Sequence, residues 1–233
     1  MIPIGDENAG SVLKPYVNFT LIGLCVLIFL YEMILPEGQL NALFFEWGAV
    51  PARIMNGEGL ITIFTSMFLH GGWSHLLGNM VFLYVFGDNI EDAMGHVQYL
   101  LFYLLCGIAA AGLQIALDPG STIPMIGASG AISGVMGAYL VLFPQGRVRA
   151  LMFIGAFGQV ILVPAWTMIG LWFGLQLLSA FASLGASGEG GVAFWAHVGG
   201  FIAGAVLVFL FRNRDAVARQ NAVRAVQVAP RRR

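Results

Sequence analysis

Three short clusters of polar residues interrupt the apolar stretches of this chain. The first cluster contains His75 and Asn79, the second contains Ser129, and the third contains His197. A serine hydroxyl becomes a strong nucleophile when a neighbouring base takes its proton, and histidine titrates near neutral pH. These residue types therefore predict a serine nucleophile, Ser129, with His197 as its general base.

His75 and Asn79 are suited to another part of the same chemistry. Their spacing of four residues places them on one face of a helix. Side chains that donate hydrogen bonds stabilise the negative oxygen that forms when a nucleophile attacks a carbonyl group. Together with the backbone N–H of Ser129 at a helix N-terminus, they are predicted to form an oxyanion hole.

Each of these residues also has a purely structural explanation. A serine at a helix N-terminus is most often a cap. A histidine or asparagine inside a membrane helix often packs against a neighbouring helix or links two helices. The interpretation as one site therefore depends on whether the elements that carry these residues bring them together.

The composition indicates that lipid is the main solvent of this protein. Of its 233 residues, 58% are hydrophobic and only 10% are charged, and the mean hydropathy is +0.83. A soluble domain usually has about a quarter charged residues. The two cysteines, Cys25 and Cys106, lie in apolar runs and indicate neither a disulfide framework nor a metal site. No cofactor, metal or nucleic-acid partner is expected, and the lipid bilayer is the expected surrounding.

Six apolar segments are long enough to cross the hydrocarbon core, which needs about 20 residues of helix. We expect an all-α polytopic membrane protein with transmembrane helices at roughly 16–35, 74–94, 97–117, 128–144, 163–184 and 192–212. Proline and glycine interrupt the segment 36–73, which is predicted to be a membrane-associated loop after the first helix. The apolar segment 150–162 is expected to be re-entrant or interfacial, or to extend the fifth helix.

The basic residues predict how these helices are oriented. With six spans both termini share one side, and all but one of the 11 Lys and Arg residues lie there, the exception being Arg53. Basic residues favour the cytoplasmic side. We therefore expect a multi-pass protein of the inner (plasma) membrane with both termini cytoplasmic. Its parts are a cytoplasmic N-terminus over 1–15, a core over 16–212 and a solvated, basic C-terminal tail over 213–233.

This orientation brings the three polar clusters to one depth. The second, fourth and sixth spans all run inward from the outer surface, and each begins near one cluster. His197 then lies about 7 Å below the outer end of its helix, at a rise of about 1.5 Å per residue. Small residues permit close approach of the helices: Gly130 in the fourth span, and Gly200 and Gly204 in the sixth. Since no acidic residue is well placed to orient His197, a Ser–His dyad is predicted.

The three clusters together resemble those of the rhomboid family of intramembrane serine proteases. The HxxxN of His75 and Asn79, the GASG at 127–130 and the AHxGGxxxG at 196–204 occur in that family's order. The resemblance extends from the first span to the sixth. It implies a six-transmembrane-helix rhomboid-like bundle. It also implies cleavage of single-span or polytopic membrane-protein substrates at or near the outer membrane boundary, without metal or nucleotide.

The resemblance also implies a role for each residue of the motifs. Ser129 would be the nucleophile and His197 the base, with His75 and Asn79 at the oxyanion. Supporting packing roles fall to four glycines: Gly127, Gly130, Gly200 and Gly204. Some members have a tyrosine packed on the histidine, four residues after the nucleophile, where this chain has Ser133. This difference leaves open what restrains the His197 ring.

Three other functions compete with the protease. An inactive rhomboid-like protein that binds membrane clients should lack the serine or the histidine, and both are present. A small transporter should show internal repeats or acidic residues at mid-membrane. A zinc protease should contain a motif such as HExxH, whereas His70 and His75 have neither that spacing nor the glutamate. The sequence leaves the substrate and the oligomeric state open.

Overall fold

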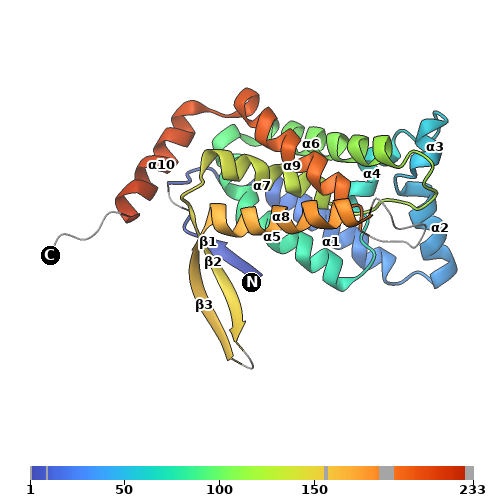
Figure 1. Ribbon diagram of the computed structural model, residues 1–233, viewed down its shortest axis with the longest axis horizontal. Coiled ribbons are helices and arrows are strands. Elements are labelled where there is room, and N and C mark those ends of the chain that lie inside the picture. Colours follow the sequence, from blue (N-terminus) through green and yellow to red (C-terminus); the bar gives the residue numbers. More distant parts are fainter. Residues whose placement is uncertain (1, 9, 155–156, 184–191, 229–233) are drawn as a thin grey trace.

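The computed structural model describes all residues except 1, 9, 155–156, 184–191 and 229–233. Its main body is a bundle of helices that run alongside one another (Figure 1). The helices that match the expected spans are α1 (Tyr16–Glu32), α5 (Trp73–Met94), α6 (His96–Leu117), α7 (Ser129–Leu142), α8 (Ala165–Ser183) and α9 (Phe194–Phe211). Each begins and ends within a few residues of the range expected from the sequence.

The apolar character of these helices is uneven. Three of them, α6, α8 and α9, are long and apolar enough to cross a membrane, and α1 and α7 are apolar but shorter. Helix α5 has 22 residues, but it carries Asp88, Glu91 and Asp92 in its second half. The fold is that of a polytopic helical membrane protein, and the number of six spans stays a prediction.

Two glycines determine where the central helices begin. Gly95 separates α5 from α6 with a φ of 86°, and Gly127 has a φ of 119° two residues before α7. Residues with a side chain rarely adopt such angles. Pro144 follows the end of α7 and cannot continue the helix. The first residue of α7, Ser129, is therefore placed by a local break in the chain.

The loop after α1 folds into short helices at one end of the bundle (Figure 1), namely α2 (Glu37–Trp47), α3 (Pro51–Met55), α4 (Thr62–Thr65) and the 3₁₀ helix η1 (Ser66–Phe68). Backbone hydrogen bonds join this loop to the segment before α7. Ala49 and Met125 exchange two of them, of 3.0 and 2.9 Å, and the N–H of Gly127 donates to the carbonyl of Ser66 at 2.8 Å. The loop thereby braces the N-terminus of α7.

Glycines allow α7 to pack closely against α9 and α6. A Cβ atom at Gly200 would overlap the carbonyl oxygen of Gly130, and one at Gly204 would overlap that of Gly134. A Cβ atom at Gly134 would lie 2.5 Å from the Cβ of Cys106 on α6. The backbones of these helices can approach this closely only because the side chains are absent.

The structure departs from the all-α expectation in one region. Three segments form an antiparallel sheet in the order β1-β2-β3, namely β1 (Ile2–Asp6), β2 (Arg147–Ile154) and β3 (Phe157–Pro164). Strands β2 and β3 extend away from the bundle (Figure 1). The expectation that residues 150–162 extend the fifth helix is therefore wrong, because the described residues of this range belong to β2 and β3 and α8 begins at Ala165. Residues 155–156 lie outside the described residues.

The physical reason lies in the period of the apolar residues. Arginine alternates with Val148 and Ala150 at the start of β2, and both of these apolar side chains are fully buried. An alternation with period two is typical of a strand that has one buried face. The pairing partners, however, include β1 at the N-terminus, so the sheet depends on a contact that is distant in sequence.

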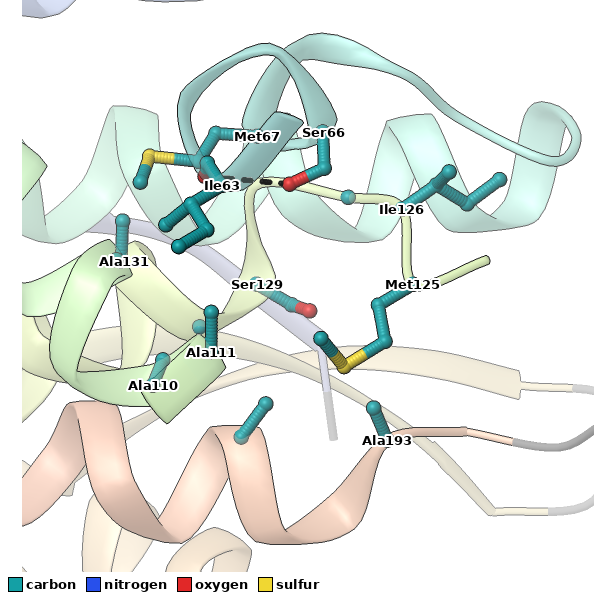
Figure 2. A pocket seen from close by; sticks show the side chains of 14 residues that line it. Ile63, Ser66, Met67, Ala110, Ala111, Met125, Ile126, Ser129, Ala131 and Ala193 are labelled. Carbon is teal, nitrogen blue, oxygen red and sulfur yellow. Dashed lines mark hydrogen bonds between the residues drawn. The ribbon is translucent and has the colours of Figure 1, made fainter. Parts of the chain in front are cut away.

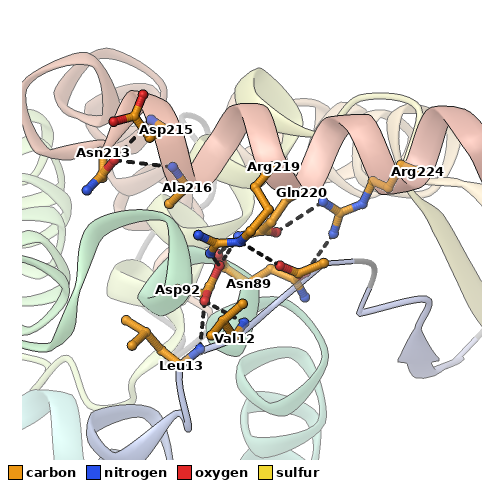
Figure 3. A network of polar contacts seen from close by, with 11 residues as sticks. Val12, Leu13, Asn89, Asp92, Asn213, Asp215, Ala216, Arg219, Gln220 and Arg224 are labelled. Carbon is orange, nitrogen blue, oxygen red and sulfur yellow. Dashed lines mark hydrogen bonds and ion pairs between the residues drawn. The ribbon is translucent and has the colours of Figure 1, made fainter.

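The C-terminal tail also differs from the expected solvated segment. Residues Arg214–Val228 form helix α10, which packs on the C-terminal half of α5. Figure 3 shows this contact as a network of polar side chains. Arg224 donates from Nη2 to Oδ1 of Asn89 at 2.6 Å, and Gln220 donates from Nε2 to Asp92 at 2.7 Å. Because Gln220 is 0% and Arg224 only 4% exposed, this part of the tail belongs to the folded core.

Candidate active site

Ser129 is the first residue of α7, so its backbone N–H belongs to the free N–H groups of a helix N-terminus. The segment that leads into it is held by the hydrogen bond between Gly127 and Ser66. Figure 2 shows Ser129 at the edge of a cavity, with small side chains of α6 and α7 around it. The hydroxyl is thus displayed at a helix terminus, where partial positive charge favours a developing anion.

His197 lies in the first turn of α9 and is 8% exposed. Its Nε2 atom is 2.8 Å from Oγ of Ser129, although the two residues are 68 positions apart in the sequence. This separation is that of a hydrogen bond. An imidazole at this distance is within reach of the hydroxyl proton, which is the geometry that a general base needs.

The glycine contacts explain how two helices bring these side chains so close. Gly130 directly follows Ser129, and Gly200 lies one turn after His197. The overlap that a Cβ atom at Gly200 would make with the Gly130 carbonyl therefore lies next to the Ser–His pair. The short distance between Oγ and Nε2 depends on this absence of side chains between the helices.

Gln176 of α8 was not among the residues singled out from the sequence, and the structure places it at the site. Its Oε1 atom is 2.7 Å from Nδ1 of His197. The sequence search looked for an acid beside the histidine, so a neutral amide was overlooked. One signal could have identified it: Gln176 is the sole amide or charged residue in α8. A polar side chain inside an apolar helix is costly unless it has a hydrogen-bond partner.

Aromatic side chains complete the surroundings of the His197 ring. Trp172, one turn before Gln176, has its ring centroid 6.0 Å from that of His197, and Phe194 lies edge-on at 6.4 Å. Ser133 is not part of this enclosure, since its hydroxyl donates to the carbonyl of Ser129 at 2.6 Å. The restraint on His197 thus comes from α8 and from its own helix.

His75 and Asn79 face the backbone just before the serine. A Cβ atom at Gly127 would lie 2.6 Å from Nε2 of His75 and 3.7 Å from Nδ2 of Asn79. Asn79 is buried, and its Nδ2 has no hydrogen-bond partner among the described residues. A buried donor without an acceptor is costly. The arrangement can therefore receive an oxygen atom that the protein itself does not supply.

His70 lies behind this pair of donors. Its ring packs edge-on against that of His75, with 5.2 Å between the centroids, and its backbone N–H donates to the Glu32 carboxylate. Burial lowers the pKa of His70 to about 4, so the ring is neutral at pH 7. His70 is therefore placed to pack on His75 rather than to exchange a proton with Ser129.

The cavity beside Ser129 has a volume of about 50 Å³. A buried water needs at least about 10–15 Å³ of such space, so a few water molecules fit. The lining is mostly small or apolar, from η1, α6, the segment before α7 and the start of α9, and it includes Ser66, Ala110, Met125, Gly127 and Ala193 (Figure 2). The space beside the serine is thus large enough to hold water.

Within the described part of the chain, no group of three His, Cys, Asp or Glu side chains could hold a metal ion. Ser129, His197 and Gln176 have the arrangement that a nucleophile, a base and an acceptor that orients the base would need. Beside them, His75 and Asn79 offer hydrogen-bond donors. Such a constellation is suited to acyl transfer, in which a carbonyl carbon is attacked and its oxygen becomes negative.

Comparison with known proteins gives a consistent result. The family model described as the Rhomboid domain matches residues 57–214, which is more than half of the chain. Rhomboid protease GluP of Bacillus subtilis (strain 168) is 30% identical over 195 residues, covering 83% of this chain and 35% of that protein. Rhomboid-like protein 11, chloroplastic, of Arabidopsis thaliana is 29% identical over 151 residues, covering 63% of this chain and 50% of that protein.

A third relative comes from yeast. Rhomboid protein 1, mitochondrial, of Saccharomyces cerevisiae is 28% identical over 142 residues, covering 58% of this chain and 41% of that protein. The chain thus spans at most half the length of these three relatives. The matched family range includes the candidate residues of all three polar clusters and Gln176.

Proposed function

This chain belongs to the rhomboid family and is an integral membrane protein, and we propose that it is an intramembrane serine endopeptidase. Its substrates would be single-span or polytopic membrane proteins, cleaved at or near the outer boundary of the bilayer. The observation that carries the proposal is the 2.8 Å separation between Oγ of Ser129 and Nε2 of His197. The two atoms lie inside a bundle of mostly apolar helices. If Ser129 were only a helix cap and His197 only a packing residue, the two side chains would not need to be in contact.

The proposed reaction begins with proton transfer from Ser129 to His197. The serine oxygen attacks the carbonyl carbon of the scissile peptide bond, and the carbonyl oxygen becomes negative. His197 then gives its proton to the leaving amine, and the C–N bond breaks. A water molecule, activated in turn by His197, hydrolyses the acyl-enzyme and restores the serine.

His75, Asn79 and the backbone N–H of Ser129 are proposed to stabilise the negative oxygen. Two observations support this role: Nδ2 of Asn79 has no partner among the described residues, and both side chains lie close to Gly127. Donors that already point at the place where charge develops need no rearrangement during the reaction. The cavity of about 50 Å³ beside Ser129 would supply the hydrolytic water.

The same proposal includes an orientation. The short helices α2, α3 and α4 lie at one end of the bundle and the sheet with α10 at the other (Figure 1). The end with the sheet also carries Lys14, Arg147 and the arginines of α10. Because basic residues favour the cytoplasm, we place this end in the cytoplasm and the Ser129 end toward the outside of an inner (plasma) membrane, with six spans between them.

Cleavage of a single-span reporter by the purified chain in detergent tests the proposal. Wild type, Ser129→Ala and His197→Ala are compared, with Ser183→Ala as the matched serine control, because Ser183 is exposed and its one side-chain hydrogen bond among the described residues goes to the carbonyl of Ala180. We expect wild type and the control to cut in the presence of a chelator. The two site variants should lose activity by about 10⁴-fold or more.

Residual cleavage by Ser129→Ala at the wild-type rate would show that another residue is the nucleophile. Inactivity of the wild type on several reporters, with the protein folded, would favour an inactive member that binds membrane clients. Loss of activity on addition of the chelator would point to a metal hydrolase instead.

A further inference from the structure

The hydrogen bond between α8 and His197 adds a third member to the proposed Ser–His pair. We propose that Gln176 is a positioning residue, whose Oε1 accepts the Nδ1–H of His197 and holds the imidazole in the tautomer with an unprotonated Nε2 toward Ser129. The inference rests on the proposed hydrolase function. It goes beyond a Ser–His dyad because it states what selects the reactive form of the base.

The argument begins with the proton of the neutral imidazole ring, which has one N–H and one bare nitrogen. Nδ1 of His197 faces an acceptor, Oε1 of Gln176, at 2.7 Å, and Nε2 faces the Ser129 hydroxyl at 2.8 Å. An acceptor at Nδ1 favours the proton on that nitrogen. The lone pair of Nε2 then points at the hydroxyl proton, as a general base requires. In the other tautomer an N–H would point at the serine oxygen, and the base would be absent.

The polar surroundings of His197 leave this role to Gln176. Among the described residues, the hydrogen bonds of the ring are those to Ser129 and Gln176. Its other close neighbours are the rings of Trp172 and Phe194, which restrain the imidazole plane but cannot select a tautomer. Among the described residues, His75 of α5 is the titratable side chain whose charge acts on His197, and it is assigned to the oxyanion.

A neutral amide is suited to this position in lipid. A carboxylate is the usual acceptor in serine hydrolases and stabilises the imidazolium as well as orienting it. An isolated charge within a membrane helix is expensive. Gln176 supplies an acceptor oxygen without that charge. It therefore fixes the tautomer at a lower free-energy cost of burying the side chain than a carboxylate would.

The alternative is that Gln176 merely joins α8 to α9. Apolar contacts already join these helices on both sides of the hydrogen bond: Phe173 stacks on Phe201 with 4.1 Å between centroids, and Phe181 meets Trp195 edge-on at 5.3 Å. Interhelical hydrogen bonds in membranes contribute little stability on average. A joining role therefore predicts a small effect of removing the amide on both stability and rate, whereas the positioning role predicts a large effect on rate alone.

The main test compares Gln176→Leu with Thr167→Val, which also removes a polar group from α8, but one whose side chain makes no hydrogen bond to the described residues. We expect Gln176→Leu to lower kcat by about 10- to 100-fold at unchanged KM and melting temperature, less than the roughly 10⁴-fold loss when a triad loses its carboxylate function. Thr167→Val should match wild type. Unchanged kcat in Gln176→Leu, or a loss of activity explained by a lower melting temperature, would overturn the proposal.

The conservative variant Gln176→Glu gives a second kinetic readout. A carboxylate at this place still accepts the Nδ1–H and also stabilises the imidazolium, so kcat should be retained. The acidic limb of kcat/KM should move to higher pH, because the imidazolium persists to higher pH beside a negative charge. An acidic limb identical to that of the wild type would contradict a direct bond between residue 176 and the base.

Nitrogen-15 NMR of the His197 imidazole tests the tautomer without any substrate. The wild type should show a protonated Nδ1 and a bare Nε2, and Gln176→Leu should show a mixture of tautomers. Equal spectra for the two proteins would contradict the positioning role of Gln176 even if the protein is a protease. Conversely, cleavage by Ser129→Ala would sink the proposed function while leaving the tautomer result intact, so the two failures can be told apart.

Discussion

Helix α5 carries two buried asparagines, ten positions apart, whose surroundings are opposite. Asn79 lies beside Gly127 near the candidate nucleophile, and its Nδ2 has no partner among the described residues. Asn89 lies in the network of Figure 3, where its Oδ1 accepts from Arg224 at 2.6 Å. Its Nδ2 donates to Asp6 and to Asn8, each at 2.9 Å.

The difference separates two uses of polar groups in an apolar bundle. A rule that treats every intramembrane polar residue as functional ranks both asparagines alike. Around Asn89 the polar atoms are almost all paired, and the charges are paired too, as in the 2.7 Å contact of Arg219 with Asp92. Such a network contributes stability and specificity, although Nε of its member Arg224 has no partner among the described residues. Around Asn79 a donor has no partner among the described residues, so it is available to an acceptor that a ligand would supply.

The largest expected effect comes from forcing the helices of the site apart. In Gly204→Leu the new side chain would overlap the carbonyl of Gly134, so α9 must move away from α7. Overpacking costs about 1–3 kcal/mol, and a displacement of about 1 Å at the reacting atoms costs roughly 100-fold in rate. We expect at least that loss of kcat on the reporter. Gly174→Leu on α8 is the control, since a Cβ there meets nothing within 4 Å.

Asn79→Ala tests the catalytic half of the comparison between the two asparagines. Removing an oxyanion donor typically lowers kcat by about 10²–10³-fold, and we expect that loss here and in His75→Ala. Because the Nδ2 of Asn79 has no partner in the described protein, its removal should leave the melting temperature unchanged or slightly raised. A lower melting temperature with unchanged kcat would assign Asn79 to structure.

Asn89→Ala should produce the opposite pattern. The change leaves the buried Arg224 and Asp6 without one partner each, at a cost of about 3 kcal/mol. The melting temperature should fall by about 5–10 °C, while kcat of the folded protein stays at the wild-type value. Arg214→Ala, at an exposed position of α10, should change neither quantity. A kcat defect in Asn89→Ala below its melting range would mean that the network acts on the site.

Asp6→Asn should have the smallest effect, and it concerns pH. Burial raises the pKa of the Asp6 carboxyl above its usual range, in spite of the hydrogen bond from Tyr139 and the charge of Arg224. Between the unfolded and folded pKa values the folded protein holds the extra proton, so its stability falls as pH rises through that window. The variant cannot titrate at residue 6. Its melting temperature, followed from about pH 4 to pH 8, should decline less than that of wild type, and parallel curves would contradict the assignment.

The helical part of the fold was accessible from the sequence. Apolar runs of about 20 residues bounded by glycine and proline mark the helices because lipid leaves the backbone few other ways to satisfy its hydrogen bonds. The hairpin at 147–164 and helix α10 were missed. Their partners are β1 and α5, which lie far away in the sequence, so no local pattern reports those contacts.

The site divides in the same way. Ser129, His197, His75 and Asn79 are recognisable in the sequence because their motifs are local, whereas Gln176 is a single amide in an apolar helix. No local sequence pattern around Gln176 indicates that its partner is His197, 21 positions further along the chain. A search restricted to acids beside histidine cannot find it.

The sequence by itself determined the solvent of this protein, the ends of its main helices and the residue types available for chemistry. These features depend on composition and on local helix-breaking residues, which can be identified without knowing any tertiary contact. Only the tertiary structure decided which polar group meets which: Ser129 with His197, His197 with Gln176, and Arg224 with Asn89. The physical reason is that these pairings follow from how glycine-lined helix faces pack. Packing between distant segments selects among many partners that the sequence leaves equivalent.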